Sequence, residues 1–221
     1  MEEAVHEALP VGTRLGEFRV EGVLGVGGFG ITYRAEDETL QRKVAVKEYL
    51  PVRLARRAED GTTVAPRSNS TYRDYSLGLR RFQDEARLLA RFSHPSIVGV
   101  TRFVEGNDTG YLVMNLEEGQ SLGQRLKGGA RLSQSELLGI ICPLLDALSL
   151  IHAGGYLHRD IKPANILLDE EGKPLITDFG LARDENQEGS RLTHDGQWVG
   201  TPHYMSPEQA DFTGLDVDTR S

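Results

Sequence analysis

Two short segments combine the side-chain types that phosphate chemistry requires. One is His158-Arg159-Asp160-Ile161-Lys162-Pro163-Ala164-Asn165, and the other, Asp178-Phe179-Gly180, begins thirteen residues after Asn165. Oxygen ligands such as those of Asn165 and Asp178 favour Mg²⁺, which is commonly shared with substrate phosphates. Asp160 and Lys162 add an anionic acceptor and a cation to the same loop. Any one of these triplets could arise by chance, but their order and spacing together predict metal-bridged phosphate chemistry.

A glycine cluster has the sequence Leu24-Gly25-Val26-Gly27-Gly28-Phe29-Gly30 and the G-x-G-x-x-G spacing. Glycine lets the backbone turn tightly and bring its N–H groups close to phosphate oxygens. In a dinucleotide-binding fold a helix follows the third glycine directly, whereas residues 31–35 alternate as a strand does. We therefore expect a loop that joins two antiparallel strands over a ligand. The alternative is a hairpin whose glycines serve only the turn.

Lys47 ends the strand-like run Val44-Ala45-Val46-Lys47. Alternation along a strand places Lys47 and the small residue Ala45 on the same face. Glu85 falls three residues after Phe82, on the apolar stripe of a predicted helix. Because an unpaired buried charge is costly, the sequence predicts that Lys47 is the cationic partner of Glu85.

The first half of the chain reads as a small antiparallel sheet with one helix. Alternating runs predict five strands, at residues 18–24, 31–35, 44–47, 97–105 and 111–116. A polar stretch over residues 51–76 predicts an inserted loop. The apolar stripe of Phe82 and Leu89 predicts a helix over residues 77–92.

The second half is predicted to be mainly helical. Ser133 and Glu136 form a capping-box pattern ahead of a long apolar helix over residues 137–151, which Pro143 should kink. A strand-rich half followed by a helical half predicts an α+β fold with two lobes. Ligands commonly bind in the cleft between two lobes.

Composition excludes several classes of protein. The 221 residues carry a net charge of −8, which argues against general nucleic-acid binding. Cys142 is the only cysteine, so neither a disulfide nor a multi-cysteine metal site can form within the chain. The longest run without a polar side chain, residues 137–145, is shorter than the roughly 18 residues of a membrane span, and the acidic N-terminus lacks a signal-peptide pattern. We expect a cytoplasmic chain with no membrane segment within it, and the alternative is tethering to a membrane through a part of the protein beyond Ser221.

Charge is distributed unevenly. Between Arg42 and Arg91 there are 12 lysines and arginines but 6 aspartates and glutamates. Such a region could dock an anionic partner. The alternative is a solvated helix face followed by a solvated loop.

Taken together, the motifs resemble a eukaryotic-type (Hanks-type) serine/threonine protein kinase of the bacterial branch. The resemblance covers residues 18–221 and rests on the glycine loop, Val44 to Lys47, His158 to Asn165, Asp178 to Gly180 and Ser206-Pro207-Glu208. It implies a bilobal α+β fold, with a five-stranded antiparallel N-lobe sheet plus one helix and a mainly helical, incomplete C-lobe. The implied parts are an N-terminal extension at 1–17, an N-lobe at 18–116 with an insert at about 51–76, and a partial C-lobe at 117–221 with an activation segment at 178–208.

The resemblance also implies a role for each motif, with ATP and Mg²⁺ as cofactors and proteins as substrates. Asp160 would accept the proton of the substrate hydroxyl, and Lys162 would neutralise charge on the transferred phosphoryl group. Asn165 and Asp178 would hold Mg²⁺. The other residues implied to bind ATP are Leu24, Gly25, Val26, Gly27, Gly28, Phe29, Gly30, Thr32, Ala45, Lys47, Glu85, Met114, Leu116 and Leu167.

Regulation through the activation segment is also implied. Arg159 and Arg183 would form a basic pocket for a phosphate on that segment. Thr193 is the predicted phosphorylation site, with Ser190 as the other candidate, and autophosphorylation would involve self-association. The alternative is a loop with incidental hydroxyls.

The chain departs from the family pattern in three places. Thr32 and Asn115 replace the usual valine and glutamate of the adenine pocket, and the sequence ends at Ser221, before the central C-lobe helix of the family. We expect this ending to expose the apolar face of the helix over residues 137–151. The alternative function is therefore a truncated, catalytically silent ATP-binding or docking module. A small-molecule phosphotransferase fits less well, because that group usually lacks this glycine loop.

Overall fold

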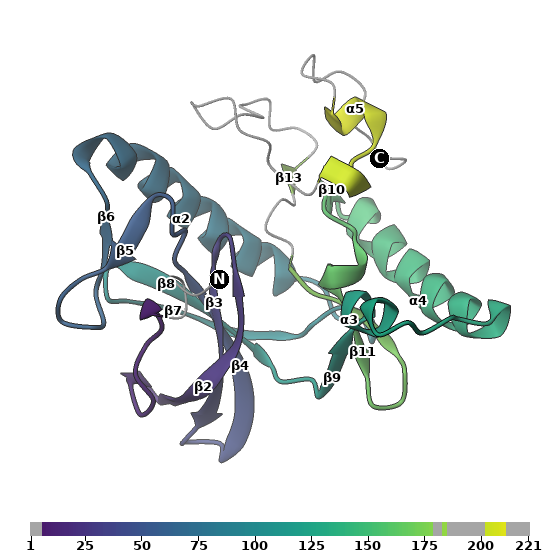
Figure 1. Cartoon of the computed structure of the whole chain (residues 1–221), viewed down its shortest axis with the longest axis horizontal. Coiled ribbons are helices and arrows are strands. Elements are labelled where there is room, and N and C mark those ends of the chain that lie inside the picture. The colour runs from purple at the N-terminus through teal and green to yellow at the C-terminus, as the bar shows by residue number, and fades with distance from the viewer. Residues whose placement is uncertain (1–5, 179–182, 185–201, 211–221) are drawn as a thin grey trace. The chain divides into compact units, whose positions relative to one another are not determined.

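A computed structural model describes residues 6–178, 183–184 and 202–210. The chain divides into two compact units. The first unit comprises residues 1–91 and 99–117, and the second comprises residues 92–98 and 118–221. Figure 1 shows the elements of both units, and each unit is described by itself.

The first unit is built on an antiparallel sheet of six strands in the order β1-β2-β3-β4-β8-β7. The strands are β1 (Arg14–Leu15), β2 (Phe18–Gly27), β3 (Gly30–Asp37), β4 (Arg42–Tyr49), β7 (Val100–Gly106) and β8 (Thr109–Asn115). The predicted five strands are confirmed, and the first and second are longer because β2 and β3 continue into the glycine loop. The additional strand, β1, comes from the segment before residue 18 and pairs with the start of β2.

The strand register assigns the residues of β4 to two different faces. Lys47 lies opposite Thr32 and Leu112, whereas Glu48 lies opposite Ile31 and Tyr111. Side chains alternate along a strand, so the face with Lys47 and the face with Glu48 are opposite sides of the sheet. On β3, β4 and β8 the Glu48 face includes eight fully buried residues, namely Ile31, Tyr33, Ala35, Val44, Val46, Glu48, Tyr111 and Val113.

One helix, α2 (Asn69–Leu89), packs against this sheet. Its apolar side joins the Lys47 face, where Phe82 contacts the rings of Tyr49 and Phe103. The helix begins eight residues before the predicted start. Ser68 and Thr71 form a capping box there, which supplies the start signal although the first turns lack an apolar stripe.

The predicted insert is a β-hairpin rather than a loop over much of its length. Strands β5 (Ala55–Arg57) and β6 (Val64–Pro66) pair in an antiparallel manner. Ala55 and Val64 are buried, so the hairpin is packed into the first unit. Each strand has only three residues, too few to show alternation in the sequence.

The second unit contains two helices of more than one turn, two small sheets and several short turns within its described part. Its elements are β9 (Gly119–Ser121), α3 (Leu122–Lys127), α4 (Gln134–Ala153), β10 (Tyr156–Leu157), η1 (Pro163–Asn165), β11 (Ile166–Asp169), β12 (Pro174–Ile176), β13 (Arg183–Asp184), η2 (Pro202–Tyr204) and α5 (Pro207–Ala210). One sheet has the order β12-β11-β9, and β10 pairs with β13. The segment from His158 to Asp178 follows β10 directly and contains η1, β11 and β12.

Helix α4 confirms the predicted long helix. Ser133 is its N-cap, and the Ser133–Glu136 capping box is present. One side of α4 is buried through Ile140, Leu144, Ala147 and Ile151. The other side exposes large apolar side chains, as the sequence predicts, namely Leu137, Leu138, Ile141, Leu145 and Leu150.

By length and composition alone, α4 could also cross a membrane. Its most apolar 18-residue window has a mean hydropathy of 1.6, and 22% of that window is buried. Core helices of globular proteins pass the same test. The absence of a membrane segment therefore stays a prediction.

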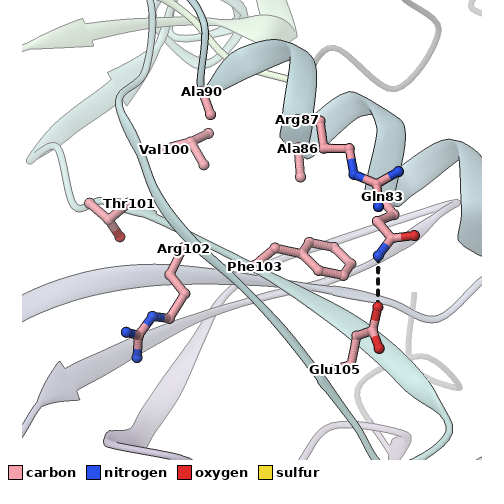
Figure 2. A pocket seen from close by; sticks show the side chains of 9 residues that line it. All are labelled: Gln83, Ala86, Arg87, Ala90, Val100, Thr101, Arg102, Phe103 and Glu105. Atoms are coloured by element: carbon pink, nitrogen blue, oxygen red, sulfur yellow. Dashed lines mark hydrogen bonds between the residues drawn. The ribbon is translucent and has the colours of Figure 1, made fainter.

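A hollow of about 540 Å³ lies on the first unit between α2 and the edge strand β7. Figure 2 shows its lining, with Ala86 and Ala90 on the helix and Val100 and Phe103 on the strand. The hydrogen bond from Gln83 Nε2 to Glu105 Oε1, 2.7 Å long, joins the two elements at one end. None of the residues predicted to bind ATP lines this hollow.

The hairpin turn between β2 and β3 yields a stability prediction. A Cβ at Gly30 would overlap the carbonyl oxygen of Glu48 and lie 3.1 Å from Leu50 N, both of which belong to the backbone. A Cβ at Gly28 would have no atom within 4 Å. We expect Gly30→Ala to lower the free energy of unfolding by about 2 kcal/mol, because β4 must shift, and Gly28→Ala to change it little. Urea unfolding of both variants tests this, and equal losses would contradict it.

Candidate active site

The carboxylate of Asp160 is held by two side chains of its own loop. Lys162 Nζ lies 2.6 Å from Asp160 Oδ2, and Asn165 Nδ2 donates a hydrogen bond to the same oxygen at 2.9 Å. Asn165 Nδ2 also donates to the Asp160 carbonyl oxygen at 2.9 Å. Asn165 is buried, while Asp160 and Lys162 are partly exposed. The loop thus fixes an anionic acceptor that solvent or a substrate can still reach.

Asp178 is connected to this loop through the residue before it. Thr177 donates two hydrogen bonds to the Asn165 carbonyl oxygen, from its backbone N at 3.0 Å and from Oγ1 at 3.2 Å. Asp178 itself has a φ of 56°, in the left-handed region that few non-glycine residues occupy. Strained backbone of this kind recurs at functional sites. The sequence motifs did not single out Thr177, because an isolated threonine after an apolar strand carries no distinctive signal.

Asn165 and Asp178 provide a donor set that fits Mg²⁺. Nδ2 of Asn165 is used by Asp160, so Oδ1 is the atom able to bind a cation, and the Asp178 side chain is exposed. Within the described ranges, no three His, Cys, Asp or Glu side chains gather into a metal cluster. Mg²⁺ needs no such cluster, because it commonly takes one or two carboxylates together with phosphates and water.

His158 lies buried next to the Asp160 loop and contacts its backbone as a neutral side chain. It is buried, and burial lowers the pKa of His158 to about 4 although the charge of Asp160 opposes this shift. Its Nδ1 accepts a hydrogen bond from the backbone N–H of Asp160 at 3.3 Å, as a neutral imidazole can. His158 therefore orients the backbone at Asp160 without adding charge.

The predicted pair of Lys47 and Glu85 is present in the first unit. Lys47 Nζ lies 3.6 Å from Glu85 Oε1, and the two side chains are 13% and 6% exposed. Lys47 Nζ also lies 5.8 Å from the centre of the Phe82 ring, a distance at which a cation interacts with the ring face. The ammonium is thus held on the sheet face where α2 packs.

Three of the other residues implied to bind ATP, namely Thr32, Ala45 and Met114, lie on that same face. Ala45 and Met114 are cross-strand neighbours and are both buried, and Thr32 lies opposite Lys47. Leu24 and Phe29 of the glycine loop are exposed. Leu116 follows β8 in the first unit, whereas Leu167 lies on β11 in the second.

The glycine loop contains glycines that the fold does not require. Gly30 is needed because its neighbour is the β4 backbone, but a Cβ at Gly25 or Gly28 would meet nothing within 4 Å. At Gly27 the nearest atom would be 3.9 Å away. Open space above a glycine backbone is what a phosphate group needs in order to approach its N–H groups.

Several predictions concern residues outside the described part of the chain. These are Phe179, Gly180, Ser190, Thr193 and most of the activation segment. Arg183 is described only as part of β13, where it pairs with Leu157. Arg159 adopts a φ of 63°. The basic pocket for an activation-segment phosphate therefore stays a prediction.

Comparisons with known proteins identify the family. The protein kinase domain matches residues 18–217. The chain is 34% identical to the probable serine/threonine-protein kinase PknB of Lactococcus lactis over 91% of its length, and 35% identical to the serine/threonine-protein kinase PknA of Mycobacterium tuberculosis over 90%. The solved structure of PpkA-294 in its apo form shares 40% identity and aligns with 79% of this chain at a TM-score of 0.75.

The matches cover most of this chain but only part of the relatives. They span 29% of PknB, 42% of PknA and 62% of the PpkA-294 chain. The matched region includes the glycine loop, Lys47, Glu85, Asp160, Asn165 and Asp178. This chain therefore belongs to the protein kinase family, in its bacterial serine/threonine branch.

Proposed function

We propose that this chain transfers the γ-phosphoryl group of ATP to serine or threonine hydroxyls of proteins, with Mg²⁺ as cofactor. The observation that carries the proposal is the carboxylate of Asp160, which Lys162 and Asn165 hold at 2.6 and 2.9 Å. Membership of the protein kinase family supports it. The names of the bacterial relatives support serine and threonine as the acceptors.

Asp160 acts mainly by orientation. Phosphoryl transfer passes through a loose transition state, so positioning and electrostatic stabilisation account for most of the catalysis. The Asp160 carboxylate accepts a hydrogen bond from the substrate hydroxyl and takes its proton as transfer proceeds. Because two side chains fix Oδ2, Oδ1 is the oxygen that faces the hydroxyl.

Lys162 acts on charge. Its ammonium balances Asp160 in the resting state and lies within reach of the same hydroxyl group. As negative charge accumulates on the phosphoryl oxygens, a cation at this position becomes more favourable. A lysine two residues after the aspartate is typical of serine/threonine kinases, which supports the proposed acceptor class.

Asn165 Oδ1 and the Asp178 carboxylate would hold Mg²⁺, which neutralises charge on the β and γ phosphates when it is bound. The two hydrogen bonds that Thr177 donates to the Asn165 carbonyl oxygen, one from its backbone and one from its side chain, keep these two residues in a fixed relation. In the first unit, Lys47 contacts the α and β phosphates, and Glu85 keeps its ammonium in place. The glycine loop contributes backbone N–H groups.

Asp160→Asn tests the assignment of the acceptor. The amide keeps the shape of the side chain but can neither accept the proton nor carry charge, so we expect kcat to fall by about 10²- to 10⁴-fold. Binding of MgATP should change less than about twofold, since Asp160 contacts the acceptor side. Phosphate transfer to a generic serine/threonine protein substrate and nucleotide titration measure the two effects.

Asp146→Asn is the matched control, because Asp146 is an exposed aspartate on α4 in the same unit. It should leave both quantities unchanged. An active Asp160→Asn protein would refute the assignment. ATP binding by the unaltered chain without any transfer would favour the catalytically silent module.

Asp178→Ala tests the assignment of the metal ligands. Removal of one of two protein ligands should raise the Mg²⁺ concentration that gives half-maximal transfer by about tenfold or more. The measurement is a Mg²⁺ titration of transfer at saturating ATP. A variant that keeps the original Mg²⁺ dependence would show that Asp178 is not a ligand.

Lys47→Met and Glu85→Gln test the coupling of the buried pair. If Glu85 acts through Lys47, then the double variant should lose no more kcat/KM for ATP than Lys47→Met alone, and the coupling free energy should be about 1 kcal/mol or more. The measurement is a double-mutant cycle on kcat/KM. Strictly additive losses would contradict the assignment.

A further inference from the structure

A second buried carboxylate, Glu48, lies next to Lys47 in β4. Its exposed fraction is 0%, and its carboxylate accepts hydrogen bonds from three side chains. Arg57 donates to both oxygens, at 2.7 and 2.6 Å, Tyr33 donates at 2.7 Å and Tyr111 donates at 3.1 Å. Burial and the negative charge of Glu48 raise the pKa values of both tyrosines, which therefore remain donors. Every described partner of Glu48 thus stabilises its charged form.

Arg57 connects this carboxylate to two segments that lie outside the strand pattern of the main sheet. Its guanidinium donates to the carbonyl oxygens of Glu7, at 2.9 and 2.7 Å, and of Thr62, at 2.8 Å. Its backbone N–H also donates to the Glu7 carboxylate. The N-terminal segment adds a hydrogen bond from Leu9 N to the Tyr33 hydroxyl at 3.1 Å. Arg57 therefore fastens both the hairpin and the N-terminal segment to one face of β4.

Two neighbouring residues of β4, Lys47 and Glu48, each form a buried ion pair, on opposite faces of the strand. On one face the cation Lys47 belongs to the strand, and its partner Glu85 comes from α2. On the other face the anion Glu48 belongs to the strand, and its partner Arg57 comes from β5. Consecutive residues share one peptide group, so a displacement of Glu48 must also move Lys47.

We infer that Arg57 is a positioning residue for Lys47. By fixing Glu48 on one face of β4, Arg57 sets the direction in which the Lys47 ammonium points on the opposite face. The inference rests on the proposed function only in that Lys47 is assigned there to the ATP phosphates. Glu48 and Arg57 contact neither phosphate nor acceptor in this assignment.

The physical reason lies in the cost of leaving Glu48 without its partner. A buried carboxylate that loses a bidentate guanidinium must gain water or another donor. Within the part of the chain that the structure describes, Tyr33 and Tyr111 already donate their single hydroxyl protons to it. We therefore expect the C-terminal end of β4 to move toward solvent, which alters the contact of Lys47 with Glu85.

The test is the chemical reactivity of Lys47, which requires no nucleotide. The full chain is treated briefly with acetic anhydride, and the acetylation rates of Lys47 and Lys43 are read by mass spectrometry. Lys43 serves as the internal reference because it lies at the other end of β4. Its side chain is 46% exposed, and its Nζ lies 2.7 Å from Glu21 Oε1. Arg57→Met should raise the acetylation rate of Lys47 by about two- to tenfold relative to Lys43.

The matched control is Arg56→Met, the same substitution at the adjacent, exposed residue of β5. It should leave the ratio of the two rates unchanged. If Arg57→Met leaves the ratio unchanged, or if the rates of Lys47 and Lys43 rise together, then Arg57 has only a structural role and the inference is overturned.

A paired variant keeps the test valid if Arg57→Met does not fold. Glu48→Leu combined with Arg57→Met removes both charges, and replacing a buried pair by apolar side chains of similar size is often tolerated. Because this variant leaves no buried charge unpaired, its thermal unfolding should lie close to that of the unaltered chain, and its Lys47 to Lys43 rate ratio should equal that of the unaltered chain. A ratio raised about twofold or more in this variant would show that the unpaired Glu48 carboxylate is not the cause, and it would overturn the inference.

Kinetics separate this inference from the proposed function. If the unaltered chain transfers phosphate, then Arg57→Met should raise KM for ATP about fivefold or more with a smaller effect on kcat, since the substitution disturbs phosphate binding. An unchanged KM would count against the inference. If the unaltered chain transfers no phosphate, then the proposed function fails, whereas the acetylation ratio still decides the role of Arg57.

Discussion

The first unit depends on two buried ion pairs that act on consecutive residues of β4. Lys47 pairs with Glu85 on one face of the sheet, and Glu48 pairs with Arg57 on the other. Each charge is costly to bury alone, so each pair requires its partner element, α2 or the β5–β6 hairpin, to be in place. The sheet, the helix and the hairpin therefore become mutually dependent through four side chains.

In the second unit, a network of hydrogen bonds and a partly exposed ion pair hold Asp160 in place. The buried amide of Asn165 bridges the backbone and the side chain of Asp160, and Thr177 fixes the Asn165 carbonyl. The neutral imidazole of His158 accepts the Asp160 N–H. The carboxylate of Asp160 stays partly exposed while hydrogen bonds fix its surroundings, which is the arrangement that positional catalysis requires.

The sequence predicted one of the two ion pairs and not the other, for a physical reason. Glu85 interrupts a long apolar helical stripe, and this position predicts a buried carboxylate. Glu48 follows Val44 and Val46 at strand spacing and carried the same signal, but its partner lies in a three-residue strand within a polar stretch. Such a strand is too short for periodicity to reveal.

The loop motifs around Asp160 could be recognised in the sequence because their chemistry depends on residue type and spacing. The φ values of 63° at Arg159 and 56° at Asp178 could not be predicted, because they depend on tertiary contacts.

The boundary of the family match does not coincide with the boundary of the physical unit. The kinase domain match begins at residue 18, yet the network around Glu48 includes the Glu7 carbonyl and the Leu9 N–H. Leu9 is buried, and β1, which lies before the match, pairs with the start of β2. Because Glu7, Leu9 and the β5–β6 hairpin together bind the side chains of the Glu48 face, residues 6–17 belong to the folding unit that holds Lys47. The residues that hold Lys47 in place therefore extend beyond the region that the family match covers.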